Sequence, residues 1–181
     1  AKNKVNAVII HGPTGCGKTS AVYALAHELN YEVVEVNASD ARNADALHSL
    51  VGQSSKQRSL FAQHKLILVD EIDGLSGHKD RGGVQALVEI IASSRQPIIL
   101  TAMNPYEQKL NSLRKICTLI EFRALDYLAI FHLLKRICAA EKIHAEDIDV
   151  KTLARRSAGD ARAAINDLQI LTSTTKTLRP K

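Results

Sequence analysis

The sequence predicts an α/β fold, in which a five-stranded parallel sheet flanked by helices is followed by a small three-helix domain. Two observations support this prediction. Short apolar runs alternate with helical patterns over the first two thirds of the chain, as in strand–helix–strand units. Beyond about residue 124 we find no further strand signal, and only helical periodicity remains. The predicted strands are residues 7–11, 31–37, 66–69, 97–101 and 118–122.

The predicted helices are recognised by apolar residues that recur on one face. Residues 18–30 form the first of them, with Val22, Leu25, Ala26 and Leu29 on one face. A short helix is expected at 44–50, before a polar stretch at 54–63, and a half-buried helix begins near residue 84. In the C-terminal part, helical stripes predict three helices, the last of which is capped by Asp160.

Composition narrows the function classes. Of 181 residues, 45% are hydrophobic and 24% are charged, which is typical of a soluble globular protein. The net charge of +5 mildly favours polyanionic partners, whereas 4% aromatic residues and no Trp argue against a base-stacking platform. The three cysteines are widely spaced, which indicates neither a disulfide framework nor a zinc site. No long apolar run or signal peptide is present, so we expect a cytosolic or nuclear protein and no membrane partner.

A glycine-rich segment joins the first strand to the first helix. It has the spacing of a P-loop, whose backbone N–H groups surround phosphate oxygens. Lys18 is expected to reach the β- and γ-phosphates, and the Thr19 hydroxyl to bind Mg²⁺. A chance glycine-rich turn is the alternative, but strand, loop and helix follow in the required order. The segment reads Gly12, Pro13, Thr14, Gly15, Cys16, Gly17, Lys18, Thr19.

Two carboxylates follow the third predicted strand. Asp70, at the carboxyl end of a parallel strand, can hold the Mg²⁺ shell through water. Glu71 is placed to polarise a water molecule that attacks the γ-phosphate. Acidic residues after strands are common, so this pair alone would be weak evidence. Together with the glycine-rich segment, it predicts a site that binds and hydrolyses a nucleoside triphosphate.

The combination of motifs resembles the AAA+ ATPases and, among them, the archaeal type of replication factor C large subunit, a DNA sliding-clamp loader. Besides the two nucleotide motifs, the resemblance includes Asn-Ala-Ser-Asp at 37–40, Asp-Arg-Gly-Gly at 80–83 and a Gly-Asp-Ala-Arg run at 159–162. It covers essentially the whole chain. It implies strand order 5-1-4-3-2, with a nucleotide-binding domain at 1–124, a helical lid at 125–175 and a linker or tail at 176–181.

The resemblance also assigns roles in catalysis. Arg162 takes the position of an arginine that reaches from the lid to the γ-phosphate. The residues alone would favour a solvated arginine paired with Asp160 or Asp167. Asn104 is the candidate for the polar residue after the fourth strand, although the family's asparagine position is held by Met103. Either the strand end shifts to bring Asn104 in, or water positioning is weakened.

A second departure concerns the arginine that clamp-loader small subunits donate to a neighbour's ATP. Ile116 holds that position here, and Arg114 lies two positions away. The resemblance therefore implies that this chain receives such an arginine and donates none.

The resemblance implies a hetero-oligomeric ring with clamp-loader small subunits, a sliding clamp and the backbone of primer–template DNA. Arg42, Lys79 and Arg81 fall near DNA-tracking positions, although each reads equally well as a solvated loop charge. We expect the chain to be a fragment without the family's N-terminal segment and C-terminal collar, cytoplasmic if archaeal and nuclear if eukaryotic. The alternatives are another AAA+ DNA-processing motor and a nucleotide-binding scaffold with little turnover.

Overall fold

The computed structural model describes residues 7–38, 64–75 and 82–178. These residues form two compact units. The first contains the residues up to Gly12 and those from Lys18 to Glu121, and the second contains Pro13–Gly17 and the residues from Phe122 onward. The predicted helix at 44–50 and the three candidate DNA-contacting residues lie outside the described part of the chain.

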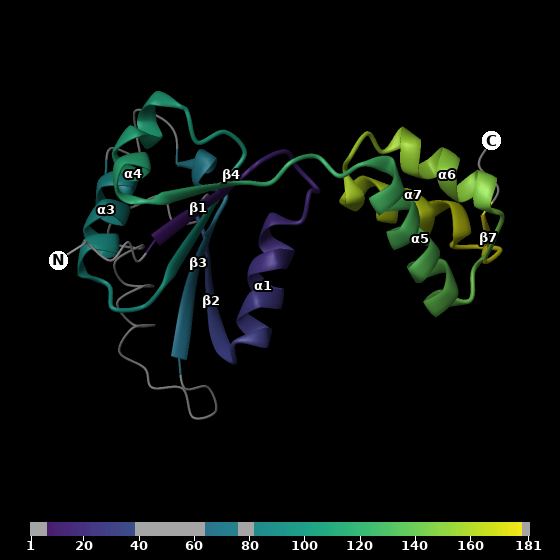
Figure 1. Cartoon of the computed structure of the whole chain (residues 1–181), viewed down its shortest axis with the longest axis horizontal. Coiled ribbons are helices and arrows are strands. Elements are labelled where there is room, and N and C mark those ends of the chain that lie inside the picture. The colour runs from purple at the N-terminus through teal and green to yellow at the C-terminus, as the bar shows by residue number, and fades with distance from the viewer. Residues whose placement is uncertain (1–6, 39–63, 76–81, 179–181) are drawn as a thin grey trace. The chain divides into compact units, whose positions relative to one another are not determined.

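The first unit is built on a five-stranded sheet of order β2-β3-β4-β1-β5, in which all paired strands are parallel (Figure 1). This is the predicted strand order. Because the strands are parallel, their carboxyl ends meet at one edge of the sheet. The strands are β1 (Ala7–His11), β2 (Tyr31–Asn37), β3 (His64–Asp70), β4 (Ile98–Ala102) and β5 (Thr118–Glu121).

The core of this unit comes from strands that are distant in the sequence. The central strands are apolar along their length, as expected where helices cover both faces of a parallel sheet. Ile9 of β1, Leu68 of β3 and Leu100 of β4 are fully buried. The helical elements of the unit are α1 (Lys18–Glu28), η1 (Ile72–Gly74), α3 (Gly83–Ser93), η2 (Gln108–Leu110) and α4 (Asn111–Ile116).

The first helix, α1, ends slightly earlier than predicted and buries a narrower face. Asn30 adopts the left-handed conformation (φ 57°), which closes the helix in the way helix C-termini commonly end. Val22 and Ala26 are buried as predicted, whereas Leu25 and Leu29 are 43% and 54% exposed. The apolar stripe is thus wider in the sequence than the buried face in the structure.

The second unit contains the three predicted helices, α5 (Tyr127–Glu141), α6 (Asp147–Arg156) and α7 (Ala161–Thr172). They enclose a separate small core around Ile130, Leu134 and Leu168. Asp126 and Asp160 cap α5 and α7 by accepting hydrogen bonds from the backbone N–H groups of Ala129 (2.6 Å) and Ala163 (2.9 Å).

A short strand pair in this unit corrects the expectation that no strand follows residue 124. β6 (His144–Ala145) pairs in parallel with β7 (Thr177–Leu178). Leu178 is 1% exposed, because it packs into the helical core. The expected polar tail is therefore structured at 177–178. Two-residue strands are too short to produce the alternation by which strands are recognised in a sequence.

None of the helices in the described part of the chain has both the length and the apolar character needed to span a membrane.

Candidate functional site

The glycine-rich segment leaves β1 at the carboxyl edge of the sheet and leads into α1. The N–H of Gly12 donates to the carbonyl of Ala102 at the end of β4 (3.2 Å). The backbone at Gly17 has φ 94°, and a Cβ there would meet no atom within 4 Å. The space beside Gly17 is open, so the conformation rather than crowding requires glycine. Lys18 Nζ donates to the Gly12 carbonyl (2.8 Å), which keeps the ammonium group against the segment it is expected to serve.

The middle of the segment, Pro13–Gly17, belongs to the second unit. There the N–H of Ala161, the first residue of α7, donates to the Gly15 carbonyl (3.0 Å). The Thr14 hydroxyl donates to Asp160 Oδ2 (3.3 Å). A Cβ at residue 15 would lie 1.8 Å from Asp160 Oδ1, and the φ there is 64°. Both observations explain why position 15 is glycine.

The acidic end of β3 lies against the start of α1, as the two motifs predict. Thr19 Oγ1 lies 3.2 and 3.1 Å from the two carboxylate oxygens of Asp70 and donates to this carboxylate. A second hydroxyl, that of Thr101 at the end of β4, also donates to Asp70 Oδ1. The structure therefore brings Thr19 and Asp70 together and adds Thr101, which the sequence analysis did not single out.

Glu71 follows in an unusual backbone conformation. Its φ of 57° and ψ of 50° lie in the left-handed region, which costs a residue with a side chain about 1–2 kcal/mol. Its N–H donates to Thr101 Oγ1 (3.0 Å), and the residue is exposed. Strained residues are concentrated at functional sites, and an exposed carboxylate can reach a water molecule.

The oxygen atoms of Thr19 and Asp70 fit a Mg²⁺ ion. Mg²⁺ prefers oxygen ligands and is usually held by one or two protein groups, with phosphate oxygens and water completing its shell. Among the described residues, no group of three or more His, Cys, Asp or Glu side chains could hold a metal ion. One hydroxyl and one carboxylate suit a metal ion that a bound phosphate also ligates.

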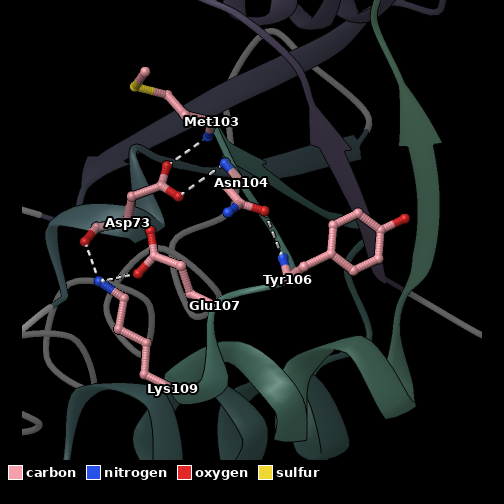
Figure 2. Close-up of polar contacts among 6 residues, drawn as sticks. All are labelled: Asp73, Met103, Asn104, Tyr106, Glu107 and Lys109. Atoms are coloured by element: carbon pink, nitrogen blue, oxygen red, sulfur yellow. Dashed lines mark hydrogen bonds and ion pairs between the residues drawn. The ribbon is translucent and has the colours of Figure 1, made fainter.

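The turn after β4 is attached to the segment after β3 through Asp73 (Figure 2). The Asp73 carboxylate accepts hydrogen bonds from the backbone N–H groups of Met103 (2.6 Å) and Asn104 (3.2 Å). Lys109 Nζ donates to the Asp73 carbonyl (2.5 Å) and pairs with Glu107 (3.0 Å). These bonds fix the position of the turn relative to η1.

Asn104 uses its side chain within its own turn. Its Oδ1 accepts a hydrogen bond from the N–H of Tyr106 (3.0 Å), and the residue is exposed (Figure 2). β4 ends at Ala102, so both Met103 and Asn104 lie beyond the strand. The assignment of a catalytic role to Asn104 stays a prediction.

Three further residues bear on the predicted arginines of the site, of which Arg162 belongs to the predicted lid and the other two concern the predicted exchange between subunits. Arg162 is exposed on the first turn of α7, in the second unit. Ile116 is the last residue of α4 and packs against the core of the first unit. The Arg114 guanidinium is held locally, because one nitrogen donates to Asn111 Oδ1 (3.0 Å) and its central carbon lies 5.4 Å from the centre of the Tyr106 ring.

The residues that sequence reasoning missed are Thr101 and Asp73. Thr101 is the polar residue at the end of an otherwise apolar run, beside the strand that carries Asp70. That signal was present, but its meaning depends on the register between β3 and β4, which the predicted strand order does not give. Nothing in the spacing of Asp73 along the chain indicated a bond to the turn after β4.

Comparison with known proteins identifies the family of this chain. A family model described as "ATPase family associated with various cellular activities (AAA)" matches residues 8–126. Three similar curated proteins are each named replication factor C large subunit. The protein of Nanoarchaeum equitans is 52% identical over 170 residues, which is 94% of this chain and 40% of that protein. Those of Staphylothermus marinus and Aeropyrum pernix are 45% and 44% identical, over 94% and 90% of this chain and 40% and 34% of those proteins.

The predicted resemblance is thereby confirmed, and the chain spans about 40% of the length of the first two of these relatives. The family match covers more than half of the chain, including the glycine-rich segment, the acidic end of β3 and the turn after β4. The chain belongs to the AAA family of ATPases.

Proposed function

We propose that this chain is the ATP-binding and ATP-hydrolysing part of a clamp-loader subunit, which opens a sliding clamp and loads it onto primer–template DNA. One observation gives the main support for ATP binding and hydrolysis. Thr19, at the start of α1, meets Asp70, at the end of β3, so the phosphate-binding and acidic motifs form one site. The similarity to replication factor C large subunits supports the clamp-loading role.

In this proposal each residue of the phosphate-binding segment and the acidic end of β3 has one task. Lys18 and the backbone N–H groups around Gly17 bind the phosphates, and Thr19 and Asp70 hold Mg²⁺. The ion would neutralise charge on the phosphate oxygens. Glu71 accepts a hydrogen bond from the attacking water, which increases its nucleophilicity. Asn104 would orient the same water through its side-chain amide nitrogen, since its Oδ1 bonds to Tyr106.

The second unit and a neighbouring subunit would complete the site. We propose that Arg162 binds the γ-phosphate, because a guanidinium makes forked contacts with phosphate oxygens. A neighbouring subunit would supply a further arginine. Ile116 cannot donate to a phosphate, and the Arg114 guanidinium is engaged by Asn111 and Tyr106. This chain would therefore receive an arginine and donate none.

The partners follow from the same proposal. They are clamp-loader small subunits, a sliding clamp and the phosphate backbone of DNA, within a hetero-oligomeric ring in the cytoplasm. Arg42, Lys79 and Arg81 would contribute phosphate contacts, which carry no sequence specificity and weaken steeply with salt. Replacing each by Ala should reduce the salt dependence of DNA binding without changing sequence preference.

The test of the ATPase is Glu71→Gln in the full-length chain, assembled with its partner subunits. Loss of the general base should lower turnover at this site about 100-fold or more while ATP still binds. Glu141→Gln, at the exposed end of α5, is the matched control and should behave as the unchanged protein. Single-turnover hydrolysis and nucleotide binding are both measured. Unchanged hydrolysis in Glu71→Gln would favour the alternative, a nucleotide-binding scaffold with little turnover.

A further inference from the structure

We propose that Thr101 is a positioning residue that holds Asp70 and Glu71 in place for ATP turnover. The inference rests on the proposed ATPase and adds a residue to its site. Thr101 is the last but one residue of β4 and is 1% exposed. Its hydroxyl donates to Asp70 Oδ1 and accepts from the N–H of Glu71 (3.0 Å). One buried side chain thus contacts both acidic residues of the site.

The sheet explains how Thr101 reaches them. β3 and β4 are parallel neighbours, and Val69 is in register with Leu100. The next residues along the two strands are Asp70 and Thr101. Because side chains alternate between the faces of a sheet, residues in the same register on neighbouring parallel strands point to the same face. The contact is therefore built into the strand pairing and does not depend on a loop.

The hydrogen-bonding capacity of a hydroxyl fits this position. A threonine hydroxyl has one donor and two acceptor sites, so it can donate to Asp70 and accept from Glu71 at once. The bond to Asp70 holds the carboxylate in the orientation in which it also meets Thr19. Both bonds are partly buried, and Thr101 itself is buried, so an unmade bond of its hydroxyl is costly.

The bond to Glu71 acts on the backbone. Glu71 occupies the left-handed region, which is unfavourable for a residue with a side chain. Its N–H donates to Thr101 Oγ1, and this bond favours the left-handed conformation from which the Glu71 side chain leaves the backbone. Without the hydroxyl, the left-handed conformation of Glu71 would lose this stabilising hydrogen bond. The Glu71 carboxylate would then be less well placed for the attacking water.

The turn that follows β4 plays a different part. Asp73 binds the backbone of Met103 and Asn104, and the Asn104 side chain bonds to Tyr106 (Figure 2). These contacts join the two loops through their backbones. The side-chain contact from β4 to Asp70 and Glu71 is made by Thr101, which lies three residues before Asn104, the polar residue predicted to act after this strand.

The first test is Thr101→Val in the full-length chain assembled with its partner subunits. Valine keeps the shape and strand preference but removes the hydroxyl. We expect kcat for ATP to fall by about 10–100-fold, the range seen when a residue supporting a metal ligand is lost, with KM changed by less than about twofold. Thr101→Ser, which retains the hydroxyl, should restore most of kcat.

A matched control comes from the second unit. Thr172 is also buried, at 5% exposure, and its hydroxyl donates to the Leu168 carbonyl (2.7 Å) within α7. Thr172→Val removes a buried hydroxyl from a place with no part in the proposed chemistry and should leave kcat unchanged. If Thr101→Val does not fold, as judged by circular dichroism, Thr101→Ala is measured in its place.

The second readout does not use activity. In the nucleotide-free protein, hydrogen exchange at the Glu71 amide should be faster in Thr101→Val than in the unchanged protein, Thr101→Ser or Thr172→Val. Unchanged exchange at Glu71, or an unchanged kcat in Thr101→Val, would overturn the inference. If Glu71→Gln abolishes hydrolysis while Thr101→Val does not affect it, the role of Thr101 fails and the ATPase stands. If Glu71→Gln has no effect, the ATPase itself fails.

Discussion

The sheet unit and the helical unit place their functional residues in different ways. In the sheet unit, Thr19, Asp70 and Thr101 meet at strand and helix ends, where each hydroxyl donates to the carboxylate. In the helical unit, Arg162 is exposed on the first turn of α7. The groups proposed to take part in the chemistry are thus held by neighbours within a packed sheet, whereas the group proposed to bind the γ-phosphate is exposed to solvent.

The two cores explain this difference. The core of the sheet unit joins five strands and several helices, and its central strands are covered on both faces. The core of the helical unit is a separate, smaller cluster from three helices and β7. Small cores supply little stability, and weakly stabilised regions open locally at low cost. From this difference we expect the sheet unit to be more rigid than the helical unit.

The largest expected effect comes from removing a core leucine from each unit. Leu134 in α5 and Leu100 in β4 are both fully buried, and Leu→Ala costs about 2–5 kcal/mol at such positions. Leu134→Ala should lower hydrogen-exchange protection in α5, α6 and α7 while the sheet amides stay protected. Leu100→Ala should lower protection throughout the sheet. An equal loss of hydrogen-exchange protection in both units after Leu134→Ala would show that the units unfold together. It would contradict the proposed difference in their stability.

The next effect concerns nucleotide binding by the sheet unit. Lys18→Ala removes an ammonium group from the phosphate-binding segment, and hydrogen bonds to charged groups contribute about 1.5–3 kcal/mol. ATP affinity of the assembled full-length protein should fall about 10–100-fold in a calorimetric titration. Arg136→Ala, an exposed charge on α5, is the control and should bind ATP normally. Equal affinity in Lys18→Ala and the unchanged protein would contradict the role of Lys18.

The next prediction concerns the alkylation rates of one cysteine in each unit, Cys117 and Cys138. Burial raises the pKa of Cys117, beside β5, to about 11, so its thiol stays protonated at neutral pH. Since only the thiolate reacts, alkylation of Cys117 should accelerate about tenfold per pH unit between pH 8 and 10. Burial also raises the pKa of Cys138 in α5, but Lys135 acts in the opposite direction. Lys135→Ala should therefore slow alkylation of Cys138 and leave Cys117 unchanged, as peptide mass spectrometry can measure.

The smallest effect is expected at the surface of the helical unit. Lys135 Nζ lies 2.6 Å from Asp147 Oδ1, and this lysine lowers the pKa of the Asp147 carboxyl. A lowered pKa stabilises the fold above the carboxyl's ordinary pKa, and the contribution is lost as pH falls through the lowered value. Because both side chains are substantially exposed, Lys135→Ala should change the melting temperature far less than Leu134→Ala. Any difference from the unchanged protein should vanish in acid; a difference that persists there would rule out the ion pair as its cause.

Much of the fold could be predicted because its signals are local. Apolar runs located all five strands, and helical stripes located α5, α6 and α7. The strand order came from the resemblance carried by the motifs, and the structure confirms it. β7 could not be foreseen, because Leu178 is a single apolar residue in a polar stretch, and its burial depends on the helices around it.

The sequence alone determined where the phosphate-binding segment and the acidic pair lie. Both motifs can be recognised from residue type and spacing, because their chemistry requires glycines, a lysine and paired carboxylates at fixed intervals. The tertiary structure decided which other groups act on them. Thr101 lies 31 residues after Asp70 in the chain, and only the pairing of β3 with β4 brings its hydroxyl to that carboxylate. Spacing along the chain does not encode contacts between strands; the order and register of the sheet do.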